Sequence, residues 1–197
     1  MHTEIEDDFR PYLEMMISGS LEFLKDPKKA AKFYGGLVTQ YPRTNHIRNT
    51  RFVMEPEQFK FYLRIVNLIA HIVATNVAVN LYADCDRHTI VLLDNPTDVP
   101  FITADQPVIN TAASPKQTAP PERFELYYPL SPTKAMLLLD SANAATPNVS
   151  KEFVEACNLR MAAHSYRQVL STSARDLESV KKFLPAYMSC FANPTEG

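Results

Sequence analysis

Glycine is scarce in this chain, with four glycines among 197 residues and none between Gly36 and Gly197. The glycine-rich loops that bind nucleotide phosphates, G-x-G-x-x-G and the Walker loop, are therefore missing, as is the G-x-S-x-G elbow of many hydrolases. Proline, by contrast, occurs 15 times. We expect proline-set bends and open loops between the elements rather than glycine hairpin turns.

Cysteine, positive charge and long apolar runs are also limited. The three cysteines are widely spaced, which favours free thiols in a reducing compartment over a disulfide framework or a metal knuckle. A formal net charge of −2 provides no overall positive field to collect nucleic acid or anionic membrane. The acidic N-terminus lacks the apolar core of a signal peptide, and polar residues interrupt every apolar run of membrane-spanning length. We therefore expect a cytoplasmic protein.

Hydrophobic spacing in the first 84 residues predicts helices. Apolar residues recur at helical intervals over 8–24. Asp26 and Pro27 are typical of the start of a second helix, which Pro42 interrupts. The longest helical pattern, 57–83, is apolar nearly all round, and this predicts one long buried helix.

The pattern changes to strands after residue 84. It predicts strands at Thr89–Leu93, Pro100–Thr103, Val108–Asn110, Phe124–Pro129, Ala135–Asp140 and Gln168–Thr172, and helices at Asn148–Arg167 and Ala174–Leu184, the latter opened by a capping box at Ser173. Residues 111–122 are rich in Pro, Ala, Ser and Thr and predict a mobile loop.

Helices come first and strands later, so the fold class is α+β. We expect a single domain over 1–197, made of a helical half (1–84) and a second half (85–197). The second half would hold a mainly antiparallel sheet of about four to five strands with one or two C-terminal helices.

The stretch Pro100–Asn110 (P-F-I-T-A-D-Q-P-V-I-N) is a candidate site. Two β-branched runs flank a polar step that ends in proline, which sets Thr103 and Asp105 at the rim of a sheet. Asp105 is a candidate general base, metal ligand or arginine partner. The plainer interpretation is an Asx-type turn in which Asp105 hydrogen-bonds the backbone beside Pro107.

A basic run at 40–51 is a second candidate, since its guanidinium groups suit a phosphate or carboxylate; they belong to Arg43, Arg48 and Arg51. Alternatively these arginines pair with nearby acids such as Glu4, Asp7 or Glu55. A third candidate is the helical face with Arg160, His164 and Arg167, whose spacing is one residue short of the usual R-x4-6-H ribonuclease helix. Its plainer interpretation is an exposed polar face. Glu125 lacks the following lysine of a two-metal nuclease.

Four segments together resemble a known family. Residues 40–48 match a helix end of the form Q-x-x-R-T-x-x-x-R, and 100–108 look like the strand signature P-F-I-T-S-D-N-P-V. Residues 128–132 look like its Y-P-L-S-P hairpin, and a helix with Asn158 leads into Val169–Ser171. In this order, over roughly residues 30 to 172, they are similar to the DUF 4238 family, a domain of unknown function found mostly in bacteria.

The resemblance strengthens the case that the polar residues of these motifs are functional, although it gives them no roles. They are Gln40, Arg43, Arg48, Thr103, Asp105 and Asn158. Two departures stand out. Ala104 and Gln106 occupy positions where the family pattern has Ser and Asn. The H-Y-V-P-x-x-Y-L module with which members usually begin is absent, and this predicts a short variant or a C-terminal fragment.

The leading hypothesis is a domain without catalysis of its own that recognises a protein partner in bacterial regulation or conflict, with no cofactor and no resident metal. The alternative is a nuclease-like hydrolase that acts on a phosphate-bearing or nucleic-acid substrate. In that case Gln40, Arg43, Arg48 and Thr103 bind the substrate anion, Asp105 is the base or a metal ligand, and Asn158 orients the substrate. A third interpretation makes the same residues a buried network that joins the two halves. No oligomeric state is predicted.

Overall fold

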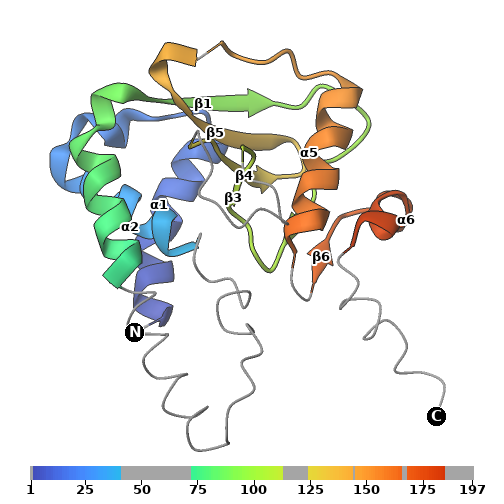
Figure 1. Ribbon diagram of the computed structural model, residues 1–197, viewed down its shortest axis with the longest axis horizontal. Helices are drawn as coiled ribbons and strands as arrows, with labels where there is room; N and C mark the ends of the chain where they lie inside the picture. Colours follow the sequence, from blue (N-terminus) through green and yellow to red (C-terminus); the bar gives the residue numbers. More distant parts are fainter. Residues whose placement is uncertain (1, 41–71, 113–123, 144, 166–167, 185–197) are drawn as a thin grey trace, which may run out of the picture. The chain divides into compact units, whose positions relative to one another are not determined.

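The computed structural model (Figure 1) describes residues 2–40, 72–112, 124–143, 145–165 and 168–184. The chain forms two compact units, Met1–Cys85 and Asp86–Gly197. The fold class is α+β, as the order of helical and strand patterns predicts.

Helices build the first unit. They are α1 (His2–Ile17), η1 (Glu22–Lys25), α2 (Pro27–Gln40) and a helical segment over 72–83. The predicted helix over 8–24 begins earlier, so that Pro11 lies inside α1. It also ends earlier, because Gly19 adopts a φ of +87° and the Gly19 N–H donates to the Met16 carbonyl at 3.0 Å. The predicted start of α2 is confirmed, since Asp26 Oδ1 accepts the Lys28 N–H at 2.9 Å.

Aromatic rings fill the core between α1, η1 and α2. The rings of Phe23 and Phe33 lie 4.9 Å apart, and those of Tyr12 and Phe23 lie 5.0 Å apart. Phe9 stacks on Phe33 at 5.8 Å. All four side chains are buried, so the helical periodicity of the first 40 residues reports a real core.

The described part of the predicted long helix, 72–83, is not buried on all sides. It buries Ala74 and Leu81, whereas Ile72, Val73 and Val79 are 50–58% exposed. The expectation of burial all round is therefore wrong for these turns, which bury a single stripe as an amphipathic helix does. Residues 57–71 lie outside the described part. Within that part, no helix combines the length and apolarity needed to cross a membrane.

The second unit contains two antiparallel sheets. The larger has the strand order β1-β5-β4-β3 and the smaller pairs β2 with β6. The strands are β1 (His88–Asp94), β2 (Thr103–Ala104), β3 (Ile109–Asn110), β4 (Leu126–Ser131), β5 (Lys134–Asp140) and β6 (Val169–Leu170). The helices are η2 (Cys85–Arg87, which starts at the unit boundary), η3 (Ser141–Asn143), α5 (Lys151–His164), α6 (Ala174–Val180) and η4 (Lys181–Phe183).

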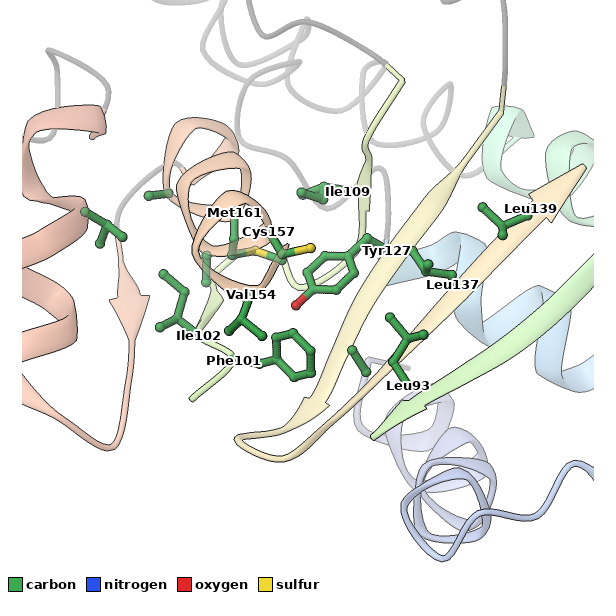
Figure 2. Packing of buried hydrophobic residues seen from close by; sticks show 14 residues of the cluster. Leu93, Phe101, Ile102, Ile109, Tyr127, Leu137, Leu139, Val154, Cys157 and Met161 are labelled. Carbon is green, nitrogen blue, oxygen red and sulfur yellow. The ribbon is translucent and has the colours of Figure 1, made fainter. Parts of the chain in front are cut away.

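Helix α5 packs on one face of the larger sheet. Figure 2 shows Tyr127 extending from β4 toward Val154 and Cys157 of α5, with Phe101 beside it. The rings of Phe101 and Tyr127 meet edge to face at 6.0 Å. The start of the Pro100–Asn110 stretch is thus anchored in this core.

The structure corrects three local predictions. Strand β2 starts at Thr103, because the predicted strand residues 100–102 bond instead to a hairpin carbonyl and to a side chain. Helix α5 starts at Lys151, because the Ser150 hydroxyl accepts the Phe153 N–H and caps it there. Ser173 precedes α6 as predicted but makes no side-chain cap bond.

Candidate functional site

Residues 100–110, which we call the signature segment, alternate between buried and outward positions. Ile102, Ala104 and Gln106 are buried, whereas Thr103 and Asp105 between them are only half-buried. Strand β2 contains only Thr103 and Ala104, and Asp105 lies in the bend that follows, but the alternating burial gives Thr103 and Asp105 the more accessible positions. The sequence predicted this placement at a rim.

The buried amide of Asn158 holds the start of the signature segment. Its Oδ1 accepts the Ile102 N–H at 3.0 Å, and its Nδ2 donates to the Pro100 carbonyl at 2.9 Å. The Phe101 N–H between them donates to the Pro132 carbonyl at 2.9 Å. Asn158 is 3% exposed, so its amide satisfies backbone groups that have little access to water.

Two further asparagines that the sequence prediction missed act in a similar way. Asn95 Nδ2 donates to the Val99 carbonyl at 2.8 Å, just ahead of the segment. Asn110 Oδ1 accepts the N–H groups of Ala112 at 3.0 Å and Glu125 at 3.2 Å, at its end. The available signal was an asparagine beside proline at 95–96 and another at a strand end, both typical of Asx turns.

The outer side of the small sheet forms a mixed polar and apolar face. In the β2–β6 register Thr103 lies opposite Leu170, and the Asp105 N–H donates to the Gln168 carbonyl at 3.0 Å. Leu170 is 56% exposed, so this side of the small sheet presents a large apolar side chain beside polar ones. We call Thr103, Asp105, Gln168 and Leu170 the β2–β6 face.

Behind this segment, burial keeps two titratable groups neutral. Burial is the main cause that raises the pKa of the Cys157 thiol to about 12, although Arg160 opposes the shift. Burial also raises the pKa of the Tyr127 hydroxyl well above 10.0, and Cys157 adds to this shift. A thiol with so high a pKa is not a nucleophile at neutral pH, so Cys157 belongs to the core.

The described residues do not place the other predicted site residues at this face. Gln40 is buried at the end of α2, in the first unit, whereas Thr103, Asp105 and Asn158 belong to the second. Arg43 and Arg48 lie outside the described residues, as do Arg51, Arg167 and the loop residues 113–122. The anion-binding group thus stays a prediction.

His164, the third sequence candidate, bonds within its own helix. Its Nδ1 lies 2.9 Å from the Arg160 carbonyl, one turn earlier in α5, to which it donates. No group of three His, Cys, Asp or Glu side chains in the described ranges is arranged to hold a metal ion.

A cavity of about 390 Å³ lies elsewhere, in the first unit. Small and apolar residues of α2 and the segment 72–83 form much of its wall, among them Gly35, Gly36, Ala74 and Ala78. None of the predicted site residues lines it. An exposed ion pair between Lys32 and Asp8, 3.7 Å apart, involves two further lining residues.

Comparison with known proteins gives one match, to the family described as "Protein of unknown function (DUF4238)", over residues 1–175. The chain belongs to the DUF4238 family. Neither the curated proteins nor the solved structures contain a match. The DUF4238 match starts ahead of the 30–172 range that the motifs cover and takes in α1, the signature segment and all of α5.

The two departures from the family pattern fall at inward positions. Ala104 is 6% exposed and Gln106 is 8% exposed, so neither side chain is presented at the outer β2–β6 face. A serine at 104 or an asparagine at 106, as in the DUF4238 signature, would lie on the buried side. The two departures therefore fall at buried positions of the segment and not at Thr103 or Asp105.

Proposed function

We propose that this DUF4238 protein is a cytoplasmic partner-recognition module of a bacterial regulatory or conflict system, without catalysis of its own. The β2–β6 face is its contact surface. The partner is a protein that offers an apolar surface to Leu170 and hydrogen-bond donors to Asp105.

The observation that carries this proposal is that both polar atoms of the Asn158 amide are already hydrogen-bonded to the backbone. Both ends of the amide bond the backbone of Pro100 and Ile102, which leaves Asn158 a positioning role toward the signature segment. A segment fixed in this way presents its outer side chains on a rigid frame, which lowers the entropy cost of binding. The other residues of the β2–β6 face are polar, so the exposed Leu170 supplies the apolar contact to the partner.

The test compares three variants as affinity baits in the native host. We expect Leu170→Asp and Asp105→Asn to lose a protein that the wild type captures, whereas Glu155→Gln, at an exposed position on α5, retains it. The captured protein is then purified and its dissociation constant measured. Loss of one anchor side chain raises that constant about tenfold or more.

The rival function has its own readout in the same variants. If the wild type hydrolyses a phosphodiester or phosphomonoester and Asp105→Asn abolishes turnover while Leu170→Asp keeps it, the module is a hydrolase and the recognition proposal is overturned. Arg43→Gln and Arg48→Gln then test the predicted anion clamp, since loss of either guanidinium would raise KM more than it lowers kcat.

A further inference from the structure

Strand β1 (His88–Asp94) is an open edge of the larger sheet. The strand order places β5 on one side of β1 and no strand on the other within the described residues. No other segment of the described ranges makes a backbone hydrogen bond to β1. The strand therefore presents backbone donors and acceptors that can pair with a further strand.

The middle of this edge, Thr89–Leu93, lacks the devices that usually prevent such pairing. The β1 sequence H-T-I-V-L-L-D contains no lysine, proline or glycine. Its register with β5 continues from His88 to Asp94 without a bulge. The strand is regular over seven residues, with an apolar middle at Ile90–Leu93, and this length is enough to support strand addition.

We propose that β1 pairs antiparallel with β1 of a second copy of this chain, about a two-fold axis at Val91. In that register Val91 lies opposite Val91 of the second copy, and Ile90 lies opposite its Leu92. His88 lies opposite its Asp94, at both ends of the pairing. Two four-stranded sheets then join into one continuous sheet.

The side chains select this register. A shift of one residue would set the face that carries α5 in one copy against the opposite face in the other. A shift of two would place His88 opposite Leu92, or Asp94 opposite Ile90. The register centred on Val91 uses the whole strand and matches unlike polar ends with each other.

Charges on β5 extend the match across the joined sheet. Asp140 lies opposite His88, and Lys134 lies opposite Asp94, with which it forms an ion pair. Pairing of two copies would thus produce the cross-strand order Asp140, His88, Asp94 and Lys134, the last two from the second copy. Acidic and basic groups alternate along it, which favours this partner over an unrelated strand.

This inference goes beyond the proposed function, because β1 and the β2–β6 face belong to different sheets. The chain's own connection 145–150, which leads from η3 to α5, makes no backbone hydrogen bond to β1 within the described residues and so leaves the edge open.

Sedimentation of the full-length chain over a concentration series tests the pairing. We expect a reversible dimer for the wild type and for His88→Lys, which keeps a basic group opposite Asp94 of the second copy. His88→Asp places two acids opposite each other at both ends, and we expect its dimer dissociation constant to rise at least about tenfold. A wild type that is monomeric at every concentration overturns the proposal, because two copies would then not pair through this edge.

Cysteine crosslinking tests the register without any change of charge. In a background with Cys85→Ser and Cys190→Ser, Val91→Cys brings two thiols together at the two-fold axis, where opposed Cα atoms lie about 4.5–5.5 Å apart. Ile90→Cys is the matched control, since it would face Leu92 of the second copy. We expect disulfide-linked dimers from Val91→Cys and far fewer from Ile90→Cys. Equal crosslinking of the two variants would rule out the register.

Discussion

Asn158 is the residue on which the candidate site depends. Its amide bonds the Ile102 N–H, which lies 56 residues earlier in the sequence, and the Pro100 carbonyl, which lies 58 residues earlier. A side chain that both accepts and donates is required there, and among the neutral residues of this size asparagine alone offers both in one planar group.

Asn158→Leu removes both bonds of the amide and measures their joint contribution to stability. Asn158→Leu leaves the Ile102 N–H and the Pro100 carbonyl without the amide, at a cost of about 1–3 kcal/mol for the buried group. We expect the thermal midpoint to fall by roughly 5–10 °C in a chain of this size. The midpoint of each variant is measured by circular dichroism against the wild type. A loss of less than a degree would mean that other bonds hold the segment.

Asn158→Asp adds a dependence on pH. The new carboxylate still accepts the Ile102 N–H but faces the Pro100 carbonyl oxygen, and burial disfavours its charge. Its pKa in the folded chain then lies above that in the unfolded chain, so the variant gains stability as the pH falls toward 4. We expect the midpoint difference from wild type to shrink between pH 7 and pH 4.5, whereas that of Asn158→Leu stays constant. Parallel pH profiles for the two variants would contradict this.

At the scale of elements, the contact between α1 and α2 depends on Gly36. A Cβ at Gly36 would lie 2.3 Å from Phe9 Cδ2, and the Phe9 ring is fixed by stacking on Phe33. Gly35, one position earlier, has no heavy atom within 4 Å of the corresponding point.

The two glycines therefore respond oppositely to alanine. Gly35→Ala gains helix propensity, and we expect the free energy of unfolding to rise by about 0.5–1 kcal/mol. Gly36→Ala has the same gain but forces α1 away from α2, so we expect a net loss of about 1–2 kcal/mol. Urea unfolding measures both values. If Gly36→Ala were as stable as Gly35→Ala, the helices would not be closely packed at this point.

For the whole molecule, buried neutral acids set the alkaline limit of stability. Burial raises the pKa of Cys157 from 9.0 to about 12 and that of Tyr34 from 10.0 to about 12. The unfolded chain loses these protons first, so unfolding releases protons and stability falls as the pH rises above 9. For each such group the slope approaches about 1.4 kcal/mol per pH unit.

Cys157→Ala isolates the first of these steps. Between pH 9 and 10 the wild-type midpoint should decline with the Cys157 contribution included, and the variant should decline less steeply in that window. Above pH 10 both proteins lose stability together, because Tyr34 and Tyr127 remain. Thermal scans at half-unit pH steps make the comparison. Identical slopes below pH 10 would show that Cys157 is not kept neutral by the fold.

The kinds of elements and their order follow from local patterns in the amino-acid sequence. Helical spacing, the Asp26–Pro27 start of α2 and the β-branched runs depend on neighbours along the chain, and all four strands of the larger sheet lie within about two residues of their predicted positions. The alternating burial that gives Thr103 and Asp105 the more accessible positions is equally local.

How these elements pair and pack, by contrast, depends on contacts between residues far apart in the chain. It divided the predicted strands between two sheets, exposed one side of 72–83, and assigned Asn158 to the backbone of residues 100–102. The sheet pairing, the exposure of 72–83 and the bonds of Asn158 all depend on groups far apart in the sequence. An asparagine side chain can bond either a substrate or a distant backbone carbonyl, and its sequence neighbours do not decide between the two. Local propensity fixes φ and ψ, whereas the partner of a buried amide is fixed by packing around it.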